Sequence, residues 1–255
     1  MRILITGAAG QVGKELVARA GQADIGVDRQ QLDICDSTAV SQLLDTHKPG
    51  VVINAAAYTA VDKAEQESER AYAVNRDGAA HLASACHALG IPLLHLSTDY
   101  VFDGKKSEPY LETDSVSPMG VYARSKWEGE QQVRAQCPEH IILRVSWVFG
   151  AHGNNFVKTI LRLARERPEL RIIADQRGCP TEAGAIAETL LSLAQRHLHD
   201  ETLPWGTYHY TGTPGTTWHG FATRIVDEAA ALGLIDKKPV VHPITTADYP
   251  LPAPR

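Results

Sequence analysis

Ile3-Leu-Ile-Thr-Gly7-Ala-Ala-Gly10-Gln-Val-Gly13, continued by Lys14–Ala20, is the stretch that decides the fold. Its residue types predict a short buried strand, a tight glycine turn and a helix. Glycines let the backbone approach a pyrophosphate, whose charge then lies at the helix N-terminus. The spacing is GxxGxxG rather than the stricter GxGxxG. The motif indicates dinucleotide binding mainly because it follows a predicted strand directly.

Strands and helices alternate regularly beyond this stretch. The segments Asp24–Asp28, Val51–Ala57, Ile91–Ser97 and Ile141–Gly150 have the character of strands, and helical segments lie between them. This alternation predicts an α/β fold, a Rossmann-type doubly wound parallel sheet with helices on both faces. We expect residues 1–150 to form this dinucleotide-binding domain, with the candidate catalytic helix. Residues 151–255, where the alternation fades, are expected to form a smaller C-terminal α/β substrate-binding lobe.

Candidate cofactor-binding residues follow the ends of the predicted strands, because ligands of such sheets bind there. Asp28 lies about 20 residues after the glycines, where a carboxylate takes ribose hydroxyls, although a turn aspartate is the alternative. Arg29 beside it could hold a 2′-phosphate, so NADH and NADPH both stay open. Asp33 and Ile34 could reach an adenine edge or belong to a plain loop. The small side chains of Ala55–Ala57 leave room for a flat group.

Tyr122 and Lys126 are the candidate acid–base pair, because residues four apart on a helix share a face. A phenol is a poor proton donor at neutral pH. A cation ~4 Å away at an effective dielectric of ~20 contributes roughly 4 kcal/mol, or about three pKa units. Thr98, at a strand end, could hydrogen-bond a substrate oxygen or only cap its own strand. Trp147 could stack on a sugar or base, or only pack.

Composition limits the classes of partner and compartment. The 255 residues carry a net charge of −5, which offers no polycation for nucleic acid or an anionic membrane. No apolar run approaches the roughly 20 residues of a membrane helix, and the N-terminus does not resemble a signal peptide. The four cysteines are far apart, which is typical of reduced thiols in a cytoplasmic protein. The eleven histidines show no metal-ligand spacing.

The glycine loop, Ser97-Thr98 and the Tyr122/Lys126 pair together resemble the extended short-chain dehydrogenase/reductase superfamily. Five longer motifs lie at Asn54–Asp62, Ser97–Gly104, Gly153–Phe156, Asp175–Thr181 and Ala247–Arg255. They are similar to the dTDP-4-dehydrorhamnose reductase family. The resemblance implies NADPH- or NADH-dependent reduction of the C4 ketone of dTDP-4-dehydro-L-rhamnose, the last step of dTDP-L-rhamnose synthesis.

Individual roles are implied by the same resemblance. Tyr122 would donate a proton to the C4 oxygen, and Lys126 would lower its pKa and bind the nicotinamide ribose. With Thr98 they form the catalytic set, while Thr98, Asp99 and Trp147 would contact the nucleotide-sugar substrate. The cofactor-binding residues would be Gly7, Gly10, Gln11, Val12, Gly13, Asp28, Asp33, Ile34, Ala57, Tyr58 and Thr59, besides Tyr122 and Lys126.

Some alternatives stay open. Related sugar-nucleotide 4,6-dehydratases place Asp-Glu after the threonine, whereas Asp99 is followed by Tyr100 here, which disfavours dehydration. The chain could reduce another nucleotide-linked 4-keto sugar, or be a non-catalytic subunit resembling the regulatory subunit of methionine adenosyltransferase. Family members usually continue past the last residue, so we expect the lobe to be truncated at its C-terminal end. A homodimer is possible, and some members hold Mg²⁺ at a dimer contact; Glu15 and Glu188 are candidates, but no metal is assigned.

Overall fold

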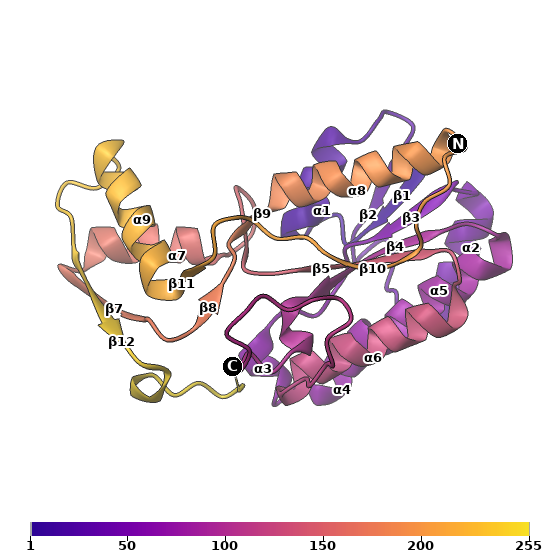
Figure 1. The fold of residues 1–255 in the computed structure, drawn as a ribbon. Helices are drawn as coiled ribbons and strands as arrows, with labels where there is room; N and C mark the ends of the chain where they lie inside the picture. The colour runs from indigo at the N-terminus through magenta and orange to yellow at the C-terminus, as the bar shows by residue number, and fades with distance from the viewer. Residues whose placement is uncertain (1, 255) are drawn as a thin grey trace. The chain divides into compact units, whose positions relative to one another are not determined.

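The fold was obtained as a computed structural model that describes residues 2–254. Six strands form one sheet in the order β10-β5-β4-β3-β1-β2, and every neighbouring pair is parallel (Figure 1). The predicted Rossmann-type doubly wound sheet is therefore confirmed. The strands are β1 (Ile3–Thr6), β2 (Ile25–Val27), β3 (Val51–Asn54), β4 (Leu93–Thr98), β5 (His140–Val145) and β10 (Gly206–His209).

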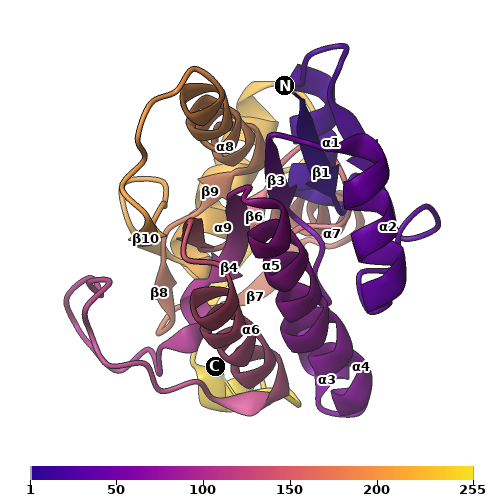
Figure 2. The same cartoon turned by 90° about the vertical axis from the view of Figure 1, so that its right-hand side faces the viewer.

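Helices cover both faces of the sheet. Figure 1 shows α1 (Gln11–Arg19) and α8 (Ala183–Leu198) on one face. On the other face lie α2 (Ser37–His47), α5 (Gly78–Leu89) and α6 (Gly120–Gln136), and Figure 2 shows α5 and α6 side by side. Because both faces are covered, β1 and β3 are buried at every residue and their sequences are continuous apolar runs rather than alternating ones.

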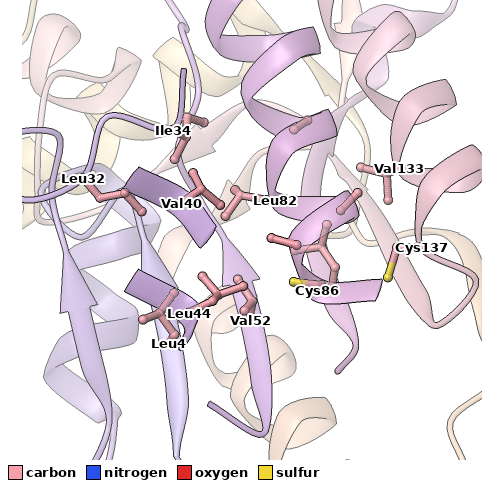
Figure 3. Packing of buried hydrophobic residues seen from close by; sticks show 14 of the residues in the cluster. Leu4, Leu32, Ile34, Val40, Leu44, Val52, Leu82, Cys86, Val133 and Cys137 are labelled. Atoms are coloured by element: carbon pink, nitrogen blue, oxygen red, sulfur yellow. The ribbon is translucent and has the colours of Figure 1, made fainter. Parts of the chain in front are cut away.

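The core between the sheet and α2, α5 and α6 is aliphatic. Figure 3 shows Leu4 and Val52 of the sheet packed beside Val40 and Leu44 of α2, with Leu82 of α5 next to them. Burying one such side chain contributes about 1.5–3 kcal/mol. This layer holds the C-terminal ends of the strands in place, where the candidate site lies.

The strand order reverses at β1, which has β2 on one side and β3 on the other. Ligands of open α/β sheets bind at such a switch point, outside the carboxyl ends of the strands. Gly7 leaves β1 at this point with a φ of +71°, and a Cβ on it would lie 2.5 Å from the backbone nitrogen of Ala56. The glycine turn therefore approaches the end of β3 more closely than any other residue type permits.

A second unit comprises Ser146–Ala183 and Thr211–Leu251. Its core is formed by α7 (Phe156–Glu166), α9 (Trp218–Ala231) and the parallel pair β7 (Glu169–Ile173) and β12 (Val240–Ile244). Two short pairs complete it, β6 (Val148–Phe149) with β9 (Thr181–Glu182) and β8 (Arg177–Gly178) with β11 (Thr216–Thr217).

The division between the units differs from the single boundary predicted at residue 150. The first unit contains Met1–Val145, Gly184–Tyr210 and Pro252–Arg255. The reason is β10, which was expected in the smaller lobe but pairs with β5 as the sixth strand of the large sheet. The strand predicted over Ile141–Gly150 is also divided, because Trp147 has a φ of 46°, which no strand tolerates.

Candidate active site

The glycine turn ends at the N-terminus of α1, where Gly10 caps the helix without a side-chain hydrogen bond and the first turn carries no acidic residue. A Cβ on Gly13 would lie 2.0 Å from the carbonyl oxygen of Gly7, so the turn has no space for any side chain at this position. The Ala8 nitrogen donates to the Val27 oxygen at 3.0 Å, which ties the turn to β2. A backbone-lined turn beside a positive helix end fits a dinucleotide pyrophosphate.

Asp28 and Arg29, at the end of β2, are both held by local contacts. The Asp28 carboxylate accepts from the backbone nitrogens of Gln30 at 2.8 Å and Gln31 at 3.1 Å. These are the contacts of a turn aspartate, the alternative to ribose binding that the sequence left open. The Arg29 guanidinium pairs with the Asp33 carboxylate at 3.5 Å, and both side chains are exposed. A hydrogen bond from the Cys35 backbone lowers the pKa of Asp33 below its usual value.

The side chain of Ile34, one of the residues considered for the adenine edge, is buried. It is 4% exposed, belongs to the core and contacts Gly78 of α5. The Ile34 carbonyl oxygen lies 3.0 Å from Nδ1 of His81. The side chain therefore packs in the core, and contact of this residue with an adenine stays a proposal.

The segment after β3 is held by a residue that the sequence analysis missed. Asn75 accepts from the Tyr58 nitrogen at 2.9 Å and donates to the Tyr58 oxygen at 3.0 Å, while the Tyr58 hydroxyl donates to Glu67 at 3.1 Å. Ala57 is half-buried and Thr59 is exposed. Asn75 itself is buried inside a helical segment.

Asn75 occupies a π-helical turn, η1 (Ala73–Asp77), between α4 (Ser68–Tyr72) and α5. Such turns inside helices occur frequently at functional sites. Its amide also donates to Oγ of Ser125 at 3.0 Å, and Ser125 in turn donates to the Tyr122 carbonyl at 2.8 Å. One buried amide therefore connects the segment after β3 with the helix that carries the candidate catalytic pair.

Thr98 and Tyr122 are brought together where β4 ends against the first turn of α6. Tyr122 is 8% exposed, and its ring packs edge-on against Tyr100 with centroids 5.6 Å apart. The Thr98 hydroxyl hydrogen-bonds with the Tyr122 side chain, and the same hydroxyl donates to Asp99 at 3.2 Å and accepts from the Tyr100 nitrogen at 3.2 Å. Thr98 and Tyr122, two of the residues predicted for catalysis, therefore lie beside each other, and the Thr98 hydroxyl also caps the end of its own strand, which was its alternative role.

The Tyr122 pKa is raised, although the spacing to Lys126 predicted that it would be lowered. Burial raises the pKa of Tyr122 above its ordinary value, and the hydrogen bond with Thr98 offsets this only in part. Lys126 is 2% exposed and donates to the Leu96 carbonyl at 2.7 Å; burial lowers its pKa to about 8. The phenol loses more stabilisation of its anion by leaving water than it gains from its surroundings, so it stays protonated and is a weaker acid than in water.

The Asp99 carboxylate is destabilised by burial beside Thr98, because desolvation raises the pKa of its carboxyl from 3.8 to about 6. A raised folded-state pKa contributes stability that is present below about pH 4 and lost as pH rises through 6. We therefore expect Asp99→Asn to raise the melting temperature at pH 7.5, with no gain near pH 4. Thermal unfolding at both pH values checks this. Asp114→Asn is the control of opposite sign, because a hydrogen bond from Lys106 lowers the pKa of Asp114.

Gly129 sets how closely α6 packs on the π-helical turn. A Cβ at this position would lie 2.0 Å from the carbonyl oxygen of Asn75. Gly129→Ala is expected to lower the free energy of unfolding by about 1–3 kcal/mol, the usual cost of overpacking. Urea unfolding measures this, with Gln131→Ala at an exposed position of the same helix as the control. Equal stability of the two variants would contradict the close approach.

Trp147 belongs to the second unit. Its indole stacks on Trp218 with ring centroids 3.5 Å apart and planes at 8°, and a Cβ on Gly178 would lie 2.3 Å from it. Its left-handed backbone is uncommon for a large residue. These contacts are the packing role that the sequence analysis left as the alternative; contact with a substrate remains a proposal.

The two acidic residues considered for Mg²⁺, Glu15 and Glu188, both pair with Arg19. The guanidinium binds the Glu15 carboxylate and lies 3.4 Å from that of Glu188. Among residues 2–254, no group of three or more His, Cys, Asp or Glu is arranged to hold a metal ion. Within the same residues, no helix has the length and apolar character needed to cross a membrane.

Known proteins resemble this chain over its whole length. A family described as "RmlD substrate binding domain" matches residues 1–255. A dTDP-4-dehydrorhamnose reductase of Aggregatibacter actinomycetemcomitans is 48% identical, covering 100% of this chain and 88% of the relative. One of Sinorhizobium fredii is 44% identical, covering 100% and 86%. The crystal structure of dTDP-4-dehydrorhamnose reductase from Bacillus anthracis in complex with NADP has a TM-score of 0.91 at 37% identity, covering 100% of this chain and 87% of that one.

Proposed function

The chain belongs to the RmlD substrate binding domain family, and from that membership we propose that it reduces the C4 ketone of dTDP-4-dehydro-L-rhamnose to dTDP-L-rhamnose with NADPH or NADH. It is an NAD(P)H-dependent oxidoreductase of dTDP-rhamnose biosynthesis. The observation that carries the proposal is the buried meeting of Thr98 with Tyr122, with Lys126 one helical turn further along α6.

In the proposed reaction, the bound nicotinamide supplies a hydride for C4. The Tyr122 phenol donates its proton to the ketone oxygen, and the Thr98 hydroxyl hydrogen-bonds the same oxygen. Burial raises the pKa of Tyr122 and so keeps the proton on the phenol until the oxygen becomes more basic. The ammonium of Lys126 would stabilise the phenolate that remains. The Thr98 hydroxyl donates to Asp99 at 3.2 Å in the free protein and would turn its hydrogen to the ketone oxygen when substrate is bound.

The cofactor residues keep the roles implied by the resemblance. Backbone groups of Gly10, Gln11 and Val12 would hold the pyrophosphate. Asp28 and Asp33 would hold the adenosine end, Ala57–Thr59 the middle of the cofactor, and Lys126 the nicotinamide ribose. A carboxylate and a guanidinium stand side by side at Asp28-Arg29, which supports use of both NADH and NADPH.

Compartment and assembly are part of the same proposal. Four free cysteines support a reducing, cytoplasmic location. The net charge of −5 supports a small-molecule partner rather than nucleic acid. A homodimer is proposed because Val17 of α1 is 45% exposed, and light scattering at micromolar concentration tests it.

A side-by-side assay tests the substrate. NADPH and NADH oxidation would be measured with dTDP-4-dehydro-L-rhamnose and with other nucleotide-linked 4-keto sugars, including a UDP-linked one. The proposal predicts the highest kcat/KM for the dTDP-rhamnose precursor. A higher value for a different sugar would assign another substrate, and cofactor binding without any oxidation would assign a non-catalytic role.

A further inference from the structure

Glu130 is a fully buried carboxylate that none of the roles above uses. It lies on α6, one turn beyond Lys126, and its side chain is 0% exposed. Oε1 accepts from Oγ of Ser97 at 2.6 Å and from Nε of Arg144 at 2.9 Å. Oε2 accepts from Nη2 of Arg144 at 2.8 Å and from Nη2 of Arg134 at 2.7 Å. Each carboxylate oxygen therefore receives two hydrogen bonds.

These contacts join three elements beneath the site. Ser97 is the residue before Thr98 on β4, and Arg144 is the partner of Ser97 on β5. Glu130 follows Lys126 by four residues and so shares its face of α6. The Ser97 bond is therefore a direct side-chain link between the strand end that carries Thr98 and the helix that carries Tyr122 and Lys126.

We propose that the Ser97–Glu130 hydrogen bond positions the catalytic residues, holding the Thr98 hydroxyl at the Tyr122 phenol; this inference rests on the proposed function. Ser97 and Glu130 are positioning residues, since neither is placed against substrate or cofactor. The bond is of the short, charge-assisted kind, which is about twice as strong as a neutral one and sets geometry as well as energy.

The pattern of contacts separates positioning from stability. The bidentate Arg144 pair already holds α6 to β5 and compensates the buried charge, so the Ser97 hydroxyl is not needed for that purpose. Burial alone would raise the pKa of Glu130, but the hydrogen bonds from Arg144 and Ser97 bring the pKa below its ordinary value. The carboxylate thus stays ionised, and the Ser97 bond keeps its charge-assisted character throughout the neutral range.

Ser97→Ala tests the proposal, because it removes one link between β4 and α6 and leaves the bond from Lys126 to the Leu96 carbonyl in place. Misplacement of reacting groups by ~1 Å can cost about 10²-fold. We expect kcat to fall ~10- to 100-fold, with the KM and the NADPH dissociation constant changed less than about twofold. Ser97→Thr keeps a hydroxyl and should restore kcat to near the wild-type value. Ser146→Ala is the matched control, since the Ser146 hydroxyl is also buried and donates at 2.6 Å, to the Cys179 carbonyl of the second unit.

A measurement without turnover separates this inference from the proposed function. In protein labelled with ¹³Cζ-tyrosine, the Tyr122 signal is assigned by its disappearance in Tyr122→Phe. Ser97→Ala should shift this signal and Ser146→Ala should not. A wild-type Tyr122 signal together with wild-type kcat in Ser97→Ala would overturn the inference. A shifted signal in a protein that reduces none of the keto sugars would overturn the proposed function and leave the positioning role standing.

Discussion

Tyr122→Phe is expected to lower kcat for ketone reduction by about 10³-fold, within the usual range for loss of a general acid. The phenylalanine ring keeps the edge-on contact with Tyr100, so helix α6 and the cofactor site should be unchanged. The NADPH dissociation constant should therefore match that of the wild type. Single-turnover stopped-flow measurements of NADPH oxidation give the rate, and fluorescence titration gives the affinity.

Tyr110→Phe is the matched control for this variant. The Tyr110 hydroxyl donates to Asp103 at 2.8 Å in the loop before α6. This variant should keep kcat within about twofold, because it removes no group proposed for proton transfer. A near wild-type rate in Tyr122→Phe would remove the phenol from the mechanism, whatever the control does.

Lys126→Met is expected to lower kcat/KM by about 10²- to 10³-fold, the usual cost of losing one electrostatic stabiliser from a buried site. Burial lowers the pKa of Lys126 to about 8, so the ammonium is present below this pH and is lost as the pH rises through it. The wild-type kcat/KM should therefore fall above pH 8, and the variant should lack this alkaline limb. A pH profile from 6 to 9.5 for both proteins measures the difference.

Lys158→Met provides the comparison for Lys126. Lys158 also donates to backbone carbonyls, those of Ala151 and Gly153, but it is exposed and lies in the second unit. Its loss should leave both kcat/KM and the alkaline limb in place. If Lys126→Met kept the wild-type limb, the titrating group would be another residue and the role given to Lys126 would be wrong.

The fold could be predicted from the sequence because its signals are local. Apolar runs of four to seven residues and the glycine turn after Ile3–Thr6 each specify an element without reference to the rest of the chain. The place of β10 could not be predicted in this way. Its pairing with β5 joins residues about 65 positions apart, and a four-residue segment such as Gly206–His209 carries no sign of the sheet that it enters.

In the candidate site, too, residues with a local sequence signal could be predicted and residues defined by tertiary contacts could not. Thr98, Tyr122 and Lys126 could be predicted because each stands at a strand end or on a helix face within a motif. Asn75 and Glu130 were missed, since a single amide or carboxylate in a helical pattern usually faces water, and only the tertiary contacts reveal that both are buried. The missed signal for Glu130 was its spacing of four from Lys126, which puts both on one helix face.

The Tyr122 pKa could not be predicted from spacing alone. A four-residue separation fixes the shared face of the two side chains, but not the burial of each or the acceptor that the lysine finds. Burial of Tyr122 raises its pKa, and the charges of Tyr100 and Asp99 act in the same direction. Electrostatic effects depend on the surroundings of both groups, which only the folded chain supplies.

The most direct test of the central claim follows the transferred hydrogen. The protein would be incubated with dTDP-4-dehydro-L-rhamnose and NADPH deuterated at C4 of the nicotinamide, in each stereochemical form, and the product examined by NMR. The account predicts dTDP-L-rhamnose with deuterium at C4 of the sugar from one of the two forms. Unchanged keto sugar, or dTDP-L-rhamnose without deuterium at C4 from either form, would contradict it.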